Sequence, residues 1–239
     1  MTSDVEIRSV VRGNLERVRD RIAAACDTAG RDVEGVRLIG VSKYVGPYPT
    51  AQLAVAGCRD LGESRPQQLW EKAETLALDG CEVRWRMIGH LQRNKVARTV
   101  PIIDSIDSVD SRRLLKAIDQ AAHQAGKRQT VLLEGNCSGD AEKHGFSPAE
   151  VDAELAERDT WPHVASDGLM TMAAREGGPD VARQNFHDLR ELRDKLRDTN
   201  GTKLDELSMG MSGDFEAAIA EGSTLVRIGS ALWEGIARE

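Results

Sequence analysis

Hydrophobic positions recur at helical spacing near the N-terminus of the chain. The six apolar positions that define this face among many charged residues are Val10, Val11, Leu15, Val18, Ile22 and Ala25. An apolar stripe of this kind predicts a long amphipathic helix over about residues 4–29, which Gly30 ends.

Beyond this helix, short apolar runs alternate with helical patterns. The runs lie at 36–41, 60–62, 86–88, 102–106, 130–133, 168–170, 206–209 and 225–228, and helical patterns between them include 111–125, 148–158, 181–197 and 214–221. Eight strands with helices between them are typical of parallel βαβ units. The pattern predicts an α/β protein with a single (β/α)8 TIM-type barrel over residues 1–239 and the additional N-terminal helix. A doubly wound open sheet is the alternative, because alternation alone does not prove that the sheet closes.

Composition narrows the class of protein. The length of 239 residues is close to the roughly 250 of one α/β barrel. The net charge of −7 argues against a nucleic-acid binder, which needs a basic surface. The chain shows no signal-peptide pattern and no apolar run of the roughly 20 residues that cross a bilayer. We therefore expect no membrane partner and a cytoplasmic location.

Cysteine and histidine spacing gives no sign of a metal site. The four cysteines (Cys26, Cys58, Cys81 and Cys137) lie far apart and form no C-x-x-C motif. Such spacing is typical of free thiols in a reducing compartment. The five histidines lack ligand spacing with one another, so we predict that the protein has no metal site.

Lys43 is the first candidate for chemistry. It follows the apolar run at 36–41 directly, and residues at the C-terminal ends of barrel strands face the mouth where active sites lie. Desolvation there favours a neutral, nucleophilic amine that forms imines with aldehydes. A surface lysine that extends its charge into solvent is the alternative.

Two loops near the C-terminus could bind an anion. Ser212 follows the seventh predicted strand, and Gly229 and Ser230 follow the eighth. Small residues and hydroxyls before a helix leave backbone N–H groups available for an anion, and barrels commonly hold phosphate at this pair of loops. Ordinary N-capping by Ser212, Asp214 or Ser230 is the alternative.

These segments also carry a family resemblance. The shared motifs, spread over nearly the whole chain, are GVSK (40–43), DLGE (60–63), IGHLQRNK (88–95), IDSVDS (106–111), GLMT (168–171), LSMGMS (207–212) and RIGS (227–230). With them the chain resembles the YggS/PROSC family, the pyridoxal phosphate homeostasis proteins, whose barrel is similar to that of alanine racemase. Three departures stand out: Ser64 occupies a position where the family usually has Asn, Glu134 one where Gln is commoner, and Trp233 one where it often has Phe.

The resemblance implies a cofactor site for pyridoxal 5′-phosphate (PLP). It implies that Lys43 forms the Schiff base, that Ser212, Gly229 and Ser230 hold the phosphate, and that Arg227 faces the pyridine nitrogen. Three further residues are expected to contact the cofactor, namely Ser64, His90 and Met209. Lys143 has two possible roles: it is either a second amine that receives or relays PLP or a solvated charge in a loop.

The same resemblance implies a protein that binds, shields and delivers PLP without catalytic turnover. The alternative is a PLP-dependent amino-acid racemase. The chain ends just past the eighth strand unit, and its only tyrosines are Tyr44 and Tyr48, so a racemase's second domain with its catalytic tyrosine is not expected. A third hypothesis is a scaffold that docks partners through the N-terminal helix. No sequence feature specifically supports it, because packing on the barrel already explains the apolar face of that helix. We expect a monomer, with apo PLP-dependent enzymes as candidate recipients.

Overall fold

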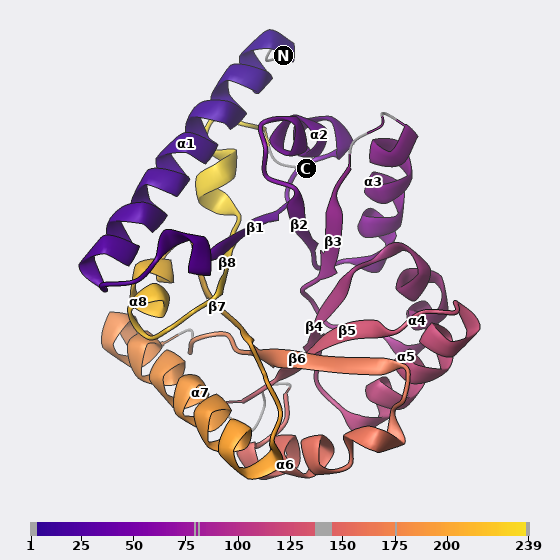
Figure 1. Ribbon diagram of the computed structural model, residues 1–239. Coiled ribbons are helices and arrows are strands. Elements are labelled where there is room, and N and C mark those ends of the chain that lie inside the picture. The colour runs from indigo at the N-terminus through magenta and orange to yellow at the C-terminus, as the bar shows by residue number, and fades with distance from the viewer. Residues whose placement is uncertain (1–3, 79, 81, 137–144, 175, 238–239) are drawn as a thin grey trace.

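The computed structural model describes residues 4–78, 80, 82–136, 145–174 and 176–237. Within these residues eight parallel strands close into a barrel in sequence order (Figure 1). The strands are β1 (Arg37–Val41), β2 (Asp60–Glu63), β3 (Arg84–Met87), β4 (Ser105–Val109), β5 (Gln129–Glu134), β6 (Val164–Met170), β7 (Glu206–Met211) and β8 (Leu225–Ile228). The last strand, β8, pairs in parallel with β1. The predicted closed barrel is therefore confirmed, and the open-sheet alternative is wrong.

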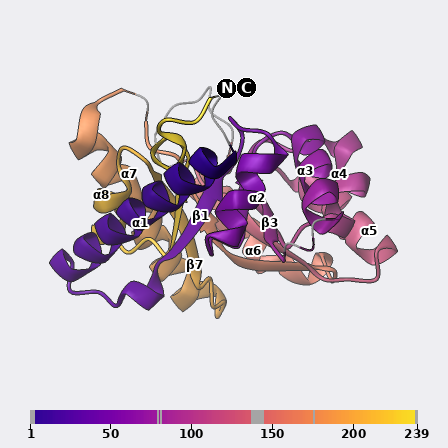
Figure 2. The same cartoon turned by 90° about the horizontal axis from the view of Figure 1, so that it is seen from above.

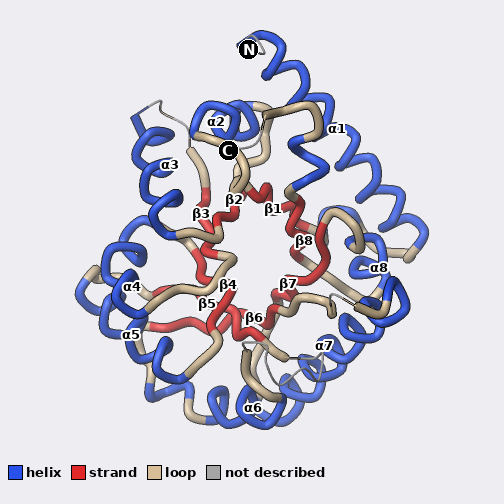
Figure 3. Tube along the Cα trace, turned by 180° about the vertical axis from the view of Figure 1, so that it is seen from behind, coloured by secondary structure: helices blue, strands red, loops and turns tan. Residues whose placement is uncertain are grey.

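Helices surround the barrel as an outer ring (Figure 3). The α-helices are α1 (Asp4–Thr28), α2 (Pro47–Val55), α3 (Pro66–Leu78), α4 (Arg93–Thr99), α5 (Arg112–Gln124), α6 (Pro148–Ala156), α7 (Gly178–Asn200) and α8 (Phe215–Ala220). Short 3-10 helices are η1 (Val33–Gly35), η2 (Val100–Ile102), η3 (Arg158–Thr160) and η4 (Ser230–Trp233). None of the helices in these ranges combines the length and apolar character needed to span a bilayer.

The N-terminal helix α1 occupies the position that a helix after β8 would take. Between β8 and residue 237, the last one described, the structure has the four-residue η4, and α1 lies outside the barrel beside α2 and α8 (Figure 2). Its buried face is mainly apolar but includes Asn14. The Asn14 amide donates to the carbonyls of Leu232 (2.8 Å) and Glu234 (2.9 Å). The predicted helix therefore completes the outer layer and holds the chain that leaves the barrel.

The fourth strand differs from its prediction. The apolar run predicted a strand at 102–106, but β4 covers Ser105–Val109 and Val100–Ile102 forms η2. The shift arises because β4 contains Asp107, which is fully buried and accepts hydrogen bonds from the Arg86 guanidinium. A hydrophobicity pattern cannot identify a strand whose inward face is charged.

Apolar side chains form two clusters. The large one includes the buried faces of the helices together with every second residue of several strands, for example Val131 and Leu133. The small one contains Ile39, Leu132, Met170 and Leu225, which alternate along their strands with members of the large cluster. Since side chains alternate across a strand, these four residues form an apolar layer inside the barrel, as expected for this fold.

Two of the four cysteines, Cys26 and Cys58, lie in the described part of the chain and are free and buried. Burial raises the pKa of the Cys58 thiol to about 12, so this thiol is an unreactive part of the core. Cys81 and Cys137 lie outside the described residues.

Candidate functional site

Lys43 lies in a tight turn at the C-terminal end of β1. The Ser42 carbonyl accepts from the Val45 amide (3.1 Å), and the Ser42 amide donates to the Gly62 carbonyl of β2 (2.9 Å). The Lys43 side chain is partly exposed, and its Nζ lies 4.9 Å from the centre of the Tyr44 ring. Within the described residues this amine has no hydrogen bond or ion pair, so it is available to an incoming group.

The loop after β7 brings Ser212 to the end of β8. Gly210 turns the chain with φ +92°, a conformation that L side chains rarely adopt. The Asp214 carboxylate then accepts from the Met211 amide (2.5 Å). In the resulting turn, Ser212 Oγ accepts from the backbone amides of Gly229 (3.2 Å) and Ala231 (3.4 Å). Two amides that converge on one oxygen form the kind of donor set that binds an anion.

Gly229 allows a close approach to these amides. Its φ of −117° is open to any residue, and an added Cβ would lie 3.5 Å from Val41 Cβ, an ordinary contact. A side chain at position 229 would therefore partly fill the space beside these amides. Val41 also accepts a hydrogen bond from the Trp233 indole at 2.7 Å. The end of β1, two residues before Lys43, thus lies beside the loop after β8.

Arg227 points into the barrel from β8 and is nearly inaccessible to solvent. Its guanidinium donates to Ser208 Oγ (2.8 Å) and to the Thr171 carbonyl (2.9 Å). Burial lowers the pKa of Arg227, while the carboxylates of Asp107 and Glu134 oppose that shift. An arginine retains its proton under these conditions, so the barrel interior holds an oriented cation that can only donate hydrogen bonds.

The other predicted contact residues lie in different surroundings. Ser64 follows β2, and its backbone leaves room only for glycine at position 89, since a Cβ there would lie 2.6 Å from the Ser64 carbonyl oxygen. His90 is half exposed and its Nδ1 lies 2.8 Å from Asp110 Oδ2. Met209 is fully buried in the large apolar cluster. Ser230 is exposed at the start of η4, and Lys143 lies outside the described residues.

The sequence patterns missed several residues that shape the site. Ser208 and Thr171 orient Arg227, and the Ala231 amide completes the donor pair. Lys72 contacts the Ser42 carbonyl at 2.8 Å. A signal for Lys72 was present, because it shares the apolar face of its helix with Leu69 and Leu76 at helical spacing. A lysine in such a face indicates a buried ion pair.

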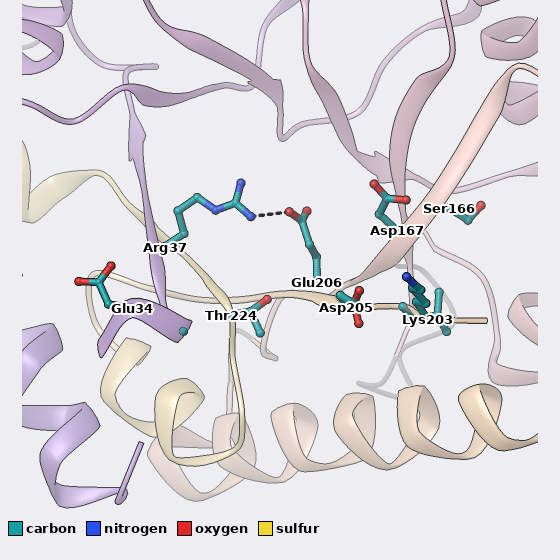
Figure 4. A pocket seen from close by; sticks show the side chains of 10 residues that line it. Glu34, Arg37, Ser166, Asp167, Lys203, Asp205, Glu206 and Thr224 are labelled. Atoms are coloured by element: carbon teal, nitrogen blue, oxygen red, sulfur yellow. Dashed lines mark hydrogen bonds and ion pairs between the residues drawn. The ribbon is translucent and has the colours of Figure 1, made fainter. Parts of the chain in front are cut away.

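A cavity opens at the N-terminal end of the barrel, opposite the end that carries Lys43. This cavity of about 490 Å³ is lined by residues at the N-terminal ends of β1, β6 and β7. Figure 4 shows that acidic side chains outnumber basic ones around it and that Arg37 faces Glu206, with which it forms an ion pair of 2.6 Å. Within the described residues no group of three or more His, Cys, Asp or Glu side chains could hold a metal ion.

Similar proteins match this chain over most of its length. A sequence profile described as "Alanine racemase, N-terminal domain" matches residues 14–236. A protein of Aquifex aeolicus named "Pyridoxal phosphate homeostasis protein" is 38% identical over 219 residues, which cover 92% of this chain and 95% of the relative.

Solved structures are similar too. The structure of PipY from Synechococcus elongatus, described with PLP bound, has a TM-score of 0.81 and 30% identity, and the match covers 93% of this chain and 99% of that one. An alanine racemase of Clostridium difficile 630 has a TM-score of 0.70 and 17% identity, and the match covers 94% of this chain but 56% of the racemase. The racemase likeness concerns the barrel fold alone.

Proposed function

Because this chain belongs to the alanine racemase N-terminal domain family, and within it to the pyridoxal phosphate homeostasis proteins, we propose that it binds PLP and holds it reversibly through Lys43. The observation that carries the proposal is the donor set after β8, where the amides of Gly229 and Ala231 converge on Ser212 Oγ beside the strand that leads into Lys43. The name and the bound cofactor of the relatives agree with the expected ligand.

Each group in the set has a role that its chemistry supports. Lys43 would hold the cofactor through its amine, a group that forms an imine with an aldehyde and releases one water. The Ser212 hydroxyl and the amides of Gly229 and Ala231 donate to the phosphate oxygens, and Ser230, at the mouth of the same loop, is a further donor. When bound, PLP supplies the aldehyde for this bond and a ring that accepts electrons.

Arg227 favours a role in binding the cofactor and disfavours catalysis with it. A guanidinium that faces the pyridine nitrogen donates a hydrogen bond and disfavours protonation of that nitrogen. An unprotonated ring accepts electrons less well than a pyridinium. The contacts from Ser208 and Thr171 support this assignment, because they fix the direction of the guanidinium.

The placement of possible proton donors also favours binding over racemisation. Tyr48 donates to the Asp4 carbonyl at the exposed surface (3.4 Å), and Tyr44 contacts the amine of its neighbour Lys43. His90 is bound to Asp110. We propose a cytoplasmic monomer that passes PLP to apo-enzymes, with no robust catalytic turnover.

Covalent labelling tests the attachment residue. Borohydride reduction with PLP followed by peptide mass mapping should place the pyridoxyl group on Lys43, and Lys43→Ala should abolish the absorbance of the lysine-bound cofactor. Lys203→Ala, which removes an exposed lysine at the opposite end of the barrel, is the matched control and should label normally. Labelling of a different lysine in the wild-type protein would contradict the assignment.

Proton exchange tests the absence of turnover. Protein loaded with PLP is incubated with single L-amino acids in deuterated water, and loss of the α-proton signal is followed by NMR. We expect rates similar to those of free PLP. Exchange near the ordinary enzyme range of about 1 to 10³ per second, lost in His90→Ala, would favour an enzyme instead.

A further inference from the structure

A buried ion pair lies directly behind the Lys43 turn. The Lys72 and Glu63 side chains are 4% and 0% exposed, and Lys72 Nζ lies 2.6 Å from Glu63 Oε2. Lys72 projects from α3, whereas Glu63 is the last residue of β2. The pair therefore joins a helix of the outer layer to the C-terminal rim of the barrel.

The Lys72 and Glu63 side chains bind the two loops that follow β1 and β2 at this end of the barrel. Lys72 Nζ donates to the Ser42 carbonyl (2.8 Å), which is part of the peptide group that leads into Lys43. Glu63 Oε2 accepts from Ser42 Oγ (3.1 Å), and Glu63 Oε1 accepts from the Ser64 amide (2.7 Å). One carboxylate thus ties the loop after β1 to the loop after β2.

Fold stability alone gives a weak account of this arrangement. Burying two charges costs several kcal/mol in desolvation, and apolar residues of similar volume are often as stabilising as the pair. A methionine at position 72 would suit the apolar face between Leu69 and Leu76. What an apolar side chain cannot supply is a fixed donor to the Ser42 carbonyl.

We propose that Lys72, supported by Glu63, is a positioning residue for Lys43. By fixing the orientation of the Ser42–Lys43 peptide, the pair directs the Lys43 amine toward the cofactor aldehyde, so that condensation with loss of water needs no rearrangement of the turn. This inference rests on the proposed attachment of PLP to Lys43. Lys72 is not itself the attachment site, because its ammonium is buried and bound to Glu63 and to Ser42.

The experiment separates capture of the aldehyde from binding of the rest of the cofactor. The double variant Glu63→Gln/Lys72→Met removes both charges together, so that neither is left unpaired. Its rate of covalent PLP capture is followed by absorbance and by borohydride trapping at Lys43. Its affinity is measured with pyridoxine 5′-phosphate, which carries an alcohol in place of the aldehyde and cannot condense. Lys127→Met is the matched control, since Lys127 Nζ also donates to backbone carbonyls, those of Val100 and Ile103.

We expect capture by the double variant to slow by about 10- to 100-fold, the scale of a small misplacement of a reacting group, with pyridoxine 5′-phosphate affinity retained. The control should match the wild type in both measurements. Lys72→Arg, which keeps the charge but shifts the donors, should also slow capture, and it serves as the test if the double variant does not fold.

Capture at the wild-type rate in a folded pair variant would overturn the role of Lys72. A parallel loss of capture and of pyridoxine 5′-phosphate affinity would overturn it too, since the pair would then support the whole pocket. Absence of labelling at Lys43 in the wild-type protein would contradict the proposed function itself. Labelling of the wild type is therefore measured first, before any variant.

Discussion

The two ends of the barrel both concentrate charge, but they use it differently. At the N-terminal end the charges satisfy one another across strands: Arg37 bonds Glu206 (2.6 Å), and Glu206 also bonds Arg86 (2.6 Å), whose guanidinium reaches Asp107 (2.9 Å) inside the barrel. Burial lowers the pKa of Arg86, but its two carboxylate partners outweigh that effect and raise it.

At the C-terminal end the donors converge on positions that a ligand could take. The amides of Gly229 and Ala231 meet at one hydroxyl oxygen, and the Lys43 amine contacts an aromatic ring. A cavity lined with charges is therefore not by itself a binding site. Charges that are already paired within the chain stabilise the fold. Backbone donors that converge on one hydroxyl oxygen, as at Ser212, indicate a place where an anion could bind.

The largest expected effect is the loss of unfolding free energy when the buried ion pair of Arg86 is broken. Arg86→Met leaves Asp107, which is fully buried, without the guanidinium that donates to it, and breaking a buried pair in this way costs about 3–5 kcal/mol. Urea unfolding should show this loss, while the folded variant still labels at Lys43. A loss of less than about 1 kcal/mol, the scale of an exposed pair, would contradict a structural role for this end.

The next effect is on affinity. Ser212→Ala removes one hydrogen bond to a charged group, which is worth about 1.5–3 kcal/mol, or about 10- to 100-fold in the dissociation constant for PLP. Pyridoxal, which lacks the phosphate, should bind the wild type and the variant equally, and free phosphate should compete with PLP for the wild type. Equal affinity of the wild type for pyridoxal and PLP would argue against the whole anion loop.

The smallest effect concerns pH. Burial raises the pKa of Asp214 above its ordinary 3.8, so the folded state binds this proton more tightly than the unfolded state does. Stability contributed by the protonated form is therefore lost as pH rises through the raised pKa. Asp214→Asn keeps the acceptor for the Met211 amide, so it should be slightly more stable than the wild type at pH 7. Thermal unfolding should show that this difference disappears as pH falls toward 3.8. A difference that persists at acidic pH would exclude the carboxylate charge as its cause.

Sequence patterns predicted the layers of the fold better than the contents of the barrel. The helix over 4–29 and the alternation of eight strands with helices follow from apolar spacing, which predicted the barrel but left an open sheet as the alternative. The register of β4 was missed because Asp107 faces inward, where the charge of Arg86 compensates for it. Periodicity records which side of a strand is apolar and does not show when a polar side is buried against a partner from another strand.

Fewer residues of the candidate site than of the fold have a signal in the sequence. Lys43 and Gly229 are visible as strand-end residues, and Arg227 enters through the resemblance. The support from Lys72 depends on a contact between α3 and the loop after β1, residues that are far apart in the chain. Met209 appears beside Ser212 in the sequence, but the alternation of side chains along β7 directs it to the outer core while Ser208 points inward.

Closure of the barrel also sets an order of events during synthesis. Val41, at the end of β1, obtains its hydrogen bond from Trp233, 192 residues later. At the usual elongation rate of about 5–20 residues per second, the first strand waits roughly 10–40 seconds for this partner and for β8. During that interval β1 has an unpaired edge, a state in which strands tend to associate with other chains. Helix α1 waits as well: α2 can cover one part of its apolar face early, but the part that packs on α8 and η4 stays uncovered until the end of the barrel has been made.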